Sequence, residues 1–482
     1  MRFYRFLVRF FRLVNRLYFV EVRVSGRENF PEQGPVLLAA NHPSSILDSF
    51  LLATQLPRPV HYLGRSGLFR NPVIAAILRS LGAIPVYRVG EGADHGGRNL
   101  DVFDQVYELF ESGGCVGIFP EGRNSVMGRV YALRKGAARM SLGAEQRNDY
   151  ALGLRIVPVG VVFEDRELFM SAVLLRFGEP IAVGDYAELH RRDPEAAVEA
   201  LTARMQQALR EQALHVEDRQ VGELSSELAE VFGEDVPLEL PVGAQPGDEK
   251  PRPWAKRMLW KLLHWYRPVP ETPSGNMESR FRGRQYISRV LSHAAEVEPE
   301  TLDSLRNHLE RYRDHCRQGH LRHAPAPPRA RERLIRSRMT LYAVLVAPVA
   351  LFGLVHNLVP YLVTRFAARR SGDEAVRAFT YFGVGVLAFL AFYTGLGLWL
   401  WQATEMTLPR TLVYLALLPP TGFAALHYRR NILVYRDRIL LRALFWNHLE
   451  LARLLREERQ LLLQEFRALA QRYGEDTAVE KP

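Results

Sequence analysis

Between residues 20 and 185, short apolar runs alternate with segments of helical periodicity, and this alternation constrains the fold more than any other feature. The runs are rich in valine, isoleucine and leucine, as buried strands are. We predict strands at 20–24, 36–40, 84–87, 116–119, 156–163 and 173–177, and a helix at about 100–111. Strands and helices in alternation predict an α/β domain, with a mixed sheet flanked by helices.

Four short blocks carry polar residues at or near the ends of these predicted strands. They are 41–48 (NHPSSILD), 82–88 (GAIPVYR), 119–125 (FPEGRNS) and 157–160 (VPVG). The first block pairs His42 with Asp48, and a histidine oriented by a carboxylate can draw a proton off an alcohol. Asp48 is the only acidic residue between Glu32 and Glu91, so it is the only carboxylate that the local sequence offers to His42.

These blocks, in this order, resemble those of the glycerolipid acyltransferases, which move a fatty acyl group from a thioester onto glycerol 3-phosphate, lysophosphatidate or a lysophospholipid. The resemblance covers roughly residues 20 to 185. The commonest family pattern has four residues between His and Asp, whereas five lie between His42 and Asp48. A minority branch, which includes the fungal-type glycerol-3-phosphate/dihydroxyacetone-phosphate acyltransferases, also has five, and the sequence resembles this branch most.

The longer spacer has a geometric consequence. On a continuous helix, one extra residue would rotate Asp48 by about 100° away from His42. Pro43 suits the first turn of a helix, with His42 at its cap, so a turn before the helix can absorb the extra residue. The alternative interpretation is a histidine that caps a helix, with a surface aspartate nearby.

The resemblance implies roles for individual residues. His42 is expected to be the general base and Asp48 the partner that orients it. The expected substrate-binding residues are Asn41, Arg65, Arg88, Glu121, Gly122, Arg123 and Lys135, with Arg88, Glu121, Gly122 and Arg123 on the phosphate side. Pro158 is expected to be structural or to line the acyl channel.

The match to the family has departures. The family's threonine and arginine after the glycine of the third block are here Arg123 and Asn124. The family's lysine and glutamate upstream of Leu68 appear as Arg65 and Gly67, which loosens the match to the lysophosphatidate branch.

The resemblance implies a membrane-bound O-acyltransferase of phospholipid biosynthesis, which uses acyl-CoA or acyl carrier protein as donor and requires no cofactor and no metal. The expected acceptor is glycerol 3-phosphate or dihydroxyacetone phosphate. Two alternatives are an acceptor such as 1-acylglycerol 3-phosphate or another lysophospholipid and, in a different class, a non-catalytic lipid-binding scaffold. The sequence does not identify the acceptor, the donor, the acyl chain length or the oligomeric state.

Three other signals are weaker. The glycine-rich stretch 90–97 resembles a dinucleotide-binding loop, but its third glycine is one place late. His315, Cys316, His320 and His323 could ligate zinc, but no second cysteine pair accompanies them. The two cysteines, Cys115 and Cys316, suggest no disulfide framework, and Cys115 is expected to be a packed strand residue.

Charge and tryptophan placement favour lipid over nucleic acid as the partner. The net charge of +10 suits anionic headgroups or nucleic acid equally. All six tryptophans lie beyond residue 253, with or around long apolar segments, and tryptophan favours the membrane–water interface. Residues 1–19 place five arginines on one helical stripe, which predicts a helix lying in the headgroup plane. The alternative is a first helix that packs on a soluble domain.

Three apolar stretches, 339–363, 379–402 and 411–428, predict a C-terminal α-helical membrane region. Arginines flank the first stretch on both sides and follow the third, whereas only Arg410 lies between the second and third. The positive-inside rule then places the 403–410 loop outside and the catalytic domain on the cytoplasmic face of the inner or cell membrane. The second and third stretches would form a hairpin, and the first would be re-entrant or interfacial, although three ordinary spans are the simpler count.

Together these features predict five regions along the chain. They are an interfacial helix (1–19), an acyltransferase domain (20–232), a Pro-rich linker with a helical region (233–338), the membrane segments (339–428) and a helical cytoplasmic tail (429–482).

Overall fold

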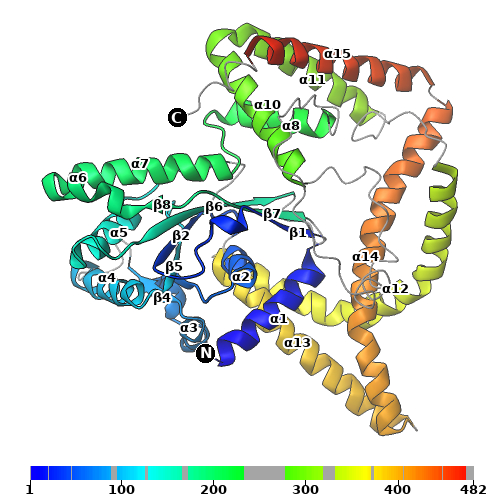
Figure 1. The fold of residues 1–482 in the computed structure, drawn as a ribbon. Helices are drawn as coiled ribbons and strands as arrows, with labels where there is room; N and C mark the ends of the chain where they lie inside the picture. Colours follow the sequence, from blue (N-terminus) through cyan, green and yellow to red (C-terminus); the bar gives the residue numbers. More distant parts are fainter. Residues whose placement is uncertain are drawn as a thin grey trace. The chain divides into compact units, whose positions relative to one another are not determined.

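The computed structural model describes residues 2–19, 21–44, 46–87, 95–124, 129–164, 172–232, 277–318, 332–370, 374–404, 406–447 and 449–473. The chain divides into two units, residues 1–226 with 276–288 and residues 227–275 with 289–482, and each is described by itself. Figure 1 labels the helices and strands as they are named below.

The first unit is built on an eight-stranded sheet with the order β1-β7-β6-β2-β5-β3-β4, in which β8 also pairs with β6. Its strands are β1 (Glu21–Ser25), β2 (Val36–Ala40), β3 (His61–Arg65), β4 (Ile84–Val86), β5 (Cys115–Ile118), β6 (Arg155–Phe163), β7 (Ala172–Phe177) and β8 (Ile181–Ala182). β6 runs antiparallel to β7 and β8, and the other pairs are parallel. The predicted mixed sheet is confirmed.

Helices cover both faces of this sheet. They are α1 (Arg2–Tyr18), α2 (Ile46–Gln55), α3 (Pro72–Ser80), α4 (His95–Glu111), α5 (Gly136–Arg147), α6 (Ala187–Arg192) and α7 (Pro194–Gln212), with short 3₁₀ turns at Arg27–Asn29, Ser66–Phe69 and Val183–Tyr186. Side chains of β2 alternate: Leu37 packs with α4, α5 and α7, whereas Leu38 packs with α2. Figure 1 shows α2 and α7 on these opposite faces. A strand that is buried on both faces consists of consecutive apolar residues, and this is why β2 could be predicted from the sequence.

Each of the six predicted strands is present within one residue of its predicted bounds. The sequence missed β3, whose residues HYLGR form no apolar run, and β8, which has two residues. Both depend on a neighbour, because β3 pairs with β4 and β5 while β8 pairs with β6.

The predicted N-terminal helix is present as α1, and one face of it packs on α2. The Phe11 ring stacks on Phe50 at 3.9 Å between centroids, and Asn15 donates to the Thr54 hydroxyl at 2.9 Å. On another face Phe6 and Leu13 remain 61% and 54% exposed. One face of α1 therefore packs on the domain, as the soluble-domain interpretation expects. Another face leaves apolar side chains exposed, as the interfacial interpretation expects.

The second unit is helical where it is described. Helices α8 (Arg219–Phe232) and α10 (Met277–Val297) each have residues in both units, and α11 (Pro299–Gln318) and α15 (Leu449–Tyr473) belong to the second. α11 pairs with α15 through His308 with Glu465 at 2.6 Å and His315 with Glu458 at 2.8 Å. The predicted helices at 194–232 and in the tail are thus present.

Three long apolar helices follow: α12 (Glu332–Arg369), α13 (Glu374–Ala403) and α14 (Leu408–Asn447). In the described residues, Ala343–Arg369 and Gly383–Ala403 are long and apolar enough to cross a membrane. The first stretch lies inside one helix, α12, which continues through Pro348 and Pro360, and its re-entrant, interfacial or spanning placement stays a prediction. The third stretch lies inside α14, which also continues through its prolines, Pro419 and Pro420.

Polar side chains join these three helices. The Tyr393 hydroxyl of α13 donates to Asn357 Oδ1 of α12 at 2.5 Å, and Asn357 Nδ2 donates to the Leu418 carbonyl of α14 at 3.2 Å. Tyr414 and His356 Nε2 form a further hydrogen bond at 2.7 Å. These contacts satisfy polar groups that would be costly in an apolar environment.

Several expectations lie outside the described residues. These are the linker and aromatic basic helix expected at 233–266, the Pro-rich end at 323–328, and Arg88 with most of the glycine-rich stretch 90–97.

Candidate active site

Parallel pairing brings the predicted blocks to one edge of the sheet. β2 pairs with β5, so Ala39 lies opposite Ile118, and β3 pairs with β4, so Arg65 lies opposite Val86. β5 and β3 are also parallel. The carboxyl ends of these four strands therefore share an edge, which is the usual place for a site in an open α/β sheet.

His42 and Asp48 meet at this edge. The His42 Nδ1 and Asp48 Oδ2 atoms are 3.0 Å apart, and the Ser44 N–H donates to the same oxygen at 2.8 Å. α2 begins at Ile46, so His42 lies in the turn before the helix and Asp48 in its first turn. The turn absorbs the longer spacer, as the sequence predicted.

The burial of this pair suits it to proton transfer. The Asp48 side chain is fully buried and the His42 side chain is 19% exposed. When Nδ1 donates to Asp48, Nε2 is the ring nitrogen that can take a proton. A buried carboxylate at a helix N-terminus is stabilised by the helix dipole and stabilises the imidazolium that forms.

Aromatic rings fix the plane of the imidazole. The Phe119 ring lies parallel to the His42 ring, at 3.7 Å between centroids and 14° between planes. The Tyr62 ring is also parallel to Phe119, at 5.9 Å. Burial, with a smaller contribution from Asp48, raises the pKa of Tyr62 well above its usual value, so its phenol is neutral beside the carboxylate.

Glu121 braces the backbone of the site. Its Oε1 accepts the His42 backbone N–H at 3.3 Å, and its Oε2 accepts the Tyr131 N–H at 2.8 Å. The side chain is buried, with an exposed fraction of 3%. Its two oxygens hold the segments that carry His42 and Tyr131, and its expected place on the phosphate side stays a prediction.

Asn41 also braces the backbone. Its Nδ2 donates to the Val161 carbonyl at 3.1 Å, and its Oδ1 accepts the Val161 N–H at 2.6 Å. Both polar atoms of this buried side chain are thus bonded to the backbone of β6. The expected substrate-binding role of Asn41 stays a prediction, and the contacts that the structure shows are with the sheet.

The arginines that were expected to bind substrate lie at different places in the structure. Arg65 is the last residue of β3, so it lies at the shared edge of the sheet, where it is partly buried. The exposed Arg123 guanidinium lies over the Tyr131 ring, 3.4 Å from its centroid. Gly122 has φ +68°, and a Cβ there would lie 2.5 Å from Arg134 Nε. Arg134, which carried no signal in the sequence, therefore lies beside this turn.

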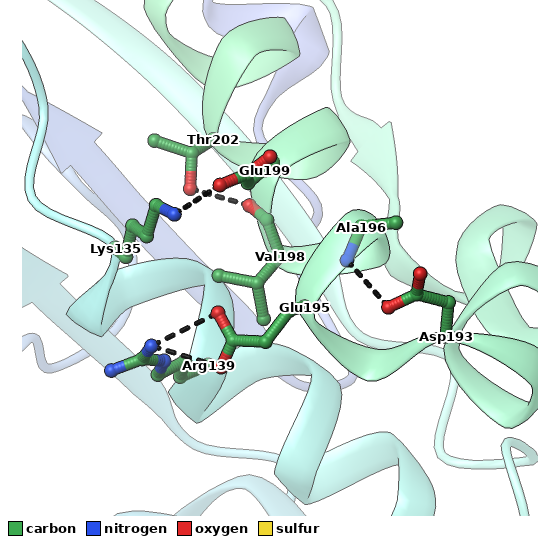
Figure 2. A network of polar contacts seen from close by, with 8 residues as sticks. All are labelled: Lys135, Arg139, Asp193, Glu195, Ala196, Val198, Glu199 and Thr202. Carbon is green, nitrogen blue, oxygen red and sulfur yellow. Dashed lines mark hydrogen bonds and ion pairs between the residues drawn. The ribbon is translucent and has the colours of Figure 1, made fainter.

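Lys135 points to a helix and not to the turn. Figure 2 shows its ammonium group paired with Glu199 of α7, beside the ion pair that Arg139 forms with Glu195 at 3.0 Å. These pairs join α5 to α7. Pro158 is buried in β6 opposite Ala39 of β2, in agreement with a structural role.

Segment 129–134 is held by a second histidine. The Val130 N–H donates to His215 Nδ1 at 3.1 Å. Burial, followed by the nearby Arg210, lowers the pKa of His215 to about 4, so this ring is neutral and its Nδ1 can accept the bond. The sequence contained no motif that marked His215, because its partner is a backbone group far away in the chain.

The weaker signals do not form a metal site where they are described. Within the described ranges, no group of three or more His, Cys, Asp or Glu side chains is arranged to hold a metal ion. His315 pairs with Glu458 instead, and His320 and His323 lie outside those ranges. Cys115 is buried, as expected, and burial raises its thiol pKa to about 12.

Comparison with known proteins agrees with this geometry. The family model described as Acyltransferase matches residues 21–162, which contain the His42–Asp48 pair, the Glu121-Gly122 turn and β6. Residues 21–162 therefore form an acyltransferase domain, and they are similar to acyltransferases that act on glycerol 3-phosphate or on 1-acylglycerol 3-phosphate. The acyltransferase domain accounts for most of the sheet, and the C-terminal helices lie beyond it.

Two curated relatives differ in how much of their length is matched. The chain is 34% identical over 112 residues to glycerol-3-phosphate O-acyltransferase 2 of Saccharomyces cerevisiae, covering 23% of this chain and 15% of that protein. It is 28% identical over 191 residues to the 1-acyl-sn-glycerol-3-phosphate acyltransferase of Bacillus subtilis, covering 39% of this chain and 87% of that protein. The match therefore spans a small part of the yeast relative and most of the bacterial one.

One solved structure is also similar. The 1-acyl-sn-glycerophosphate acyltransferase of Thermotoga maritima is 20% identical, with a TM-score of 0.30 over 42% of this chain and 80% of that one.

Proposed function

We propose that this protein is a membrane-bound acyltransferase that moves a fatty acyl group from a thioester donor to a hydroxyl of a glycerol phosphate-type acceptor. The observation that carries the proposal is the 3.0 Å contact between His42 Nδ1 and the buried Asp48. It supplies an oriented base at a sheet edge where a phosphate-bearing alcohol could be held by arginines.

The reaction follows from this geometry. His42 Nε2 takes the proton of the acceptor hydroxyl as its oxygen attacks the thioester carbonyl. This attack forms the new C–O bond and a tetrahedral intermediate, whose collapse restores the carbonyl and breaks the C–S bond. The leaving thiolate takes the proton back from the imidazolium, which Asp48 has stabilised. The chain's own residues thus need to move one proton and require no cofactor or metal, and the donor is acyl-CoA or acyl carrier protein.

The acceptor is the main alternative within this proposal. The yeast relative's name favours glycerol 3-phosphate, as does the five-residue spacer, and dihydroxyacetone phosphate is the related acceptor. The bacterial relative, most of whose length is matched, favours 1-acylglycerol 3-phosphate. All three acceptors carry a phosphate monoester.

Membrane attachment is part of the proposal. Ala343–Arg369 and Gly383–Ala403 are long and apolar enough to span, and the exposed Phe6 and Leu13 of α1 suit an interface. The arginines that flank the apolar stretches favour a catalytic domain on the cytoplasmic face.

The test is acyl transfer by membranes that contain the protein. Radiolabelled acyl-CoA is supplied with glycerol 3-phosphate, dihydroxyacetone phosphate or lysophosphatidate, and wild type is compared with His42→Ala. We expect labelled lipid from one acceptor with wild type and none above background with the variant at equal expression. Equal product from both proteins would overturn the assignment of His42.

A further inference from the structure

Arg134 rests on the Glu121-Gly122 turn. A Cβ on Gly122 would lie 2.5 Å from Arg134 Nε and 3.1 Å from its Cζ, so the guanidinium occupies the space that a side chain at 122 would fill. The left-handed φ of +68° is one that glycine adopts readily. The Arg134 backbone N–H donates to the Pro120 carbonyl at 2.9 Å, which fixes the base of this side chain to the same turn.

The same turn also holds the catalytic histidine. Phe119 stacks on the His42 ring, and the Gly122 N–H donates back to the Phe119 carbonyl at 3.1 Å. Glu121 accepts the backbone N–H of His42. A group bound at the Arg134 guanidinium would therefore be positioned by the residues that position the base.

Among the described residues, no carboxylate pairs with the Arg134 guanidinium. In the part of the chain that the structure describes, its guanidinium forms no ion pair, and the same is true of Arg123, which lies over Tyr131. The Glu121 carboxylate is buried and accepts two backbone N–H groups. Two guanidinium groups thus border a turn whose own carboxylate is engaged elsewhere, as an anion-binding site requires.

The neighbouring lysine provides the contrast. Lys135 is paired with Glu199 on α7, and Figure 2 shows its side chain among the ion pairs that join α5 to α7. Adjacent cations in the sequence therefore have different tasks, one beside the catalytic turn and one between helices.

We propose that Arg134, and not Lys135, binds the phosphate monoester of the acceptor. This inference rests on the proposed function, whose acceptors all carry such a group. A guanidinium offers two parallel N–H donors to phosphate oxygens, and the absence of a side chain at Gly122 leaves room for it beside the turn.

The experiment compares Arg134→Gln with Lys135→Gln in the full-length protein. Each variant removes one positive charge from adjacent exposed positions, so the second is a matched control for long-range electrostatics. KM is measured separately for the acceptor that wild type prefers and for acyl-CoA. Binding of glycerol 3-phosphate, with glycerol as the control lacking phosphate, is measured by calorimetry on the detergent-solubilised protein.

For Arg134→Gln we expect acceptor KM and glycerol 3-phosphate Kd to rise roughly tenfold or more, the loss typical of a charged hydrogen bond. Lys135→Gln removes only an exposed ion pair, so we expect KM and Kd to change by less than about twofold. The inference is overturned by equal effects of the two variants, by no effect of Arg134→Gln, or by a rise confined to the KM of acyl-CoA.

The two proposals fail in different ways. Wild-type protein that transfers no acyl group contradicts the proposed function, while calorimetry still tests Arg134 directly. Active wild type with an unaffected Arg134→Gln variant contradicts the inference alone.

Discussion

Asp48→Asn tests the proposed role of the carboxylate charge beside His42. Asp48 Oδ2 accepts hydrogen bonds from both His42 Nδ1 and the Ser44 N–H. An asparagine carbonyl oxygen in the same place can accept both, so the variant retains the shape of the pair. The negative charge that stabilises the imidazolium is lost.

The size of this effect follows from the 3.0 Å separation of the two atoms. Unit charges at that distance interact by about 5.5 kcal/mol at an effective dielectric constant of about 20, and by about 1.4 kcal/mol in water. Loss of these interactions would lower the rate roughly 10⁴-fold and roughly 10-fold, respectively. Since Asp48 is fully buried and the His42 side chain is 19% exposed, we expect kcat to fall roughly 10²- to 10³-fold.

The assay is the initial rate of acyl transfer from radiolabelled acyl-CoA at saturating acceptor. Glu145→Gln is the matched control, because Glu145 is likewise buried and its oxygens accept the N–H groups of Leu152 and Leu154. We expect this control to lower stability and to keep kcat within about threefold of wild type. An Asp48→Asn variant that retains more than half of the wild-type kcat would refute the role given to the carboxylate.

Two further predictions concern the bracing residues. Glu121→Ala removes the acceptor of two backbone N–H groups, so we expect about 1–3 kcal/mol of lost stability together with reduced kcat; a thermal unfolding midpoint and rate equal to wild type would contradict this. His215 has its pKa lowered to about 4 from 6.5, so the unfolded chain binds the extra proton between these pH values and stability falls as pH drops from 6.5 to 4. Because the ring is partly exposed, we expect roughly 1–2 kcal/mol for this loss, which His215→Gln should lack; equal pH slopes of the unfolding free energy for the two proteins would argue against it.

The strands that carry the site were predictable because they are buried on both faces. An apolar run such as Val36–Ala40 needs no partner to be recognised, and the positions of His42 and Glu121 after two such strands followed from it. Strand β3 has no such run, since its position depends on pairing with β4 and β5. Pairing between distant segments leaves little trace in the sequence of either one.

The sequence alone was sufficient to predict a mixed α/β sheet, a local His42–Asp48 pair and long apolar C-terminal helices. Only the tertiary structure decided which neighbours each polar side chain meets. In the structure, Asn41 is hydrogen-bonded to β6 and Glu121 accepts two backbone N–H groups. Lys135 forms an ion pair with Glu199 of α7, and Arg134 lies beside Gly122. The physical reason is that hydrophobic periodicity and residue spacing report on structure within a few residues of the chain. The direction of a side chain, in contrast, is set by contacts between segments that are far apart in the sequence.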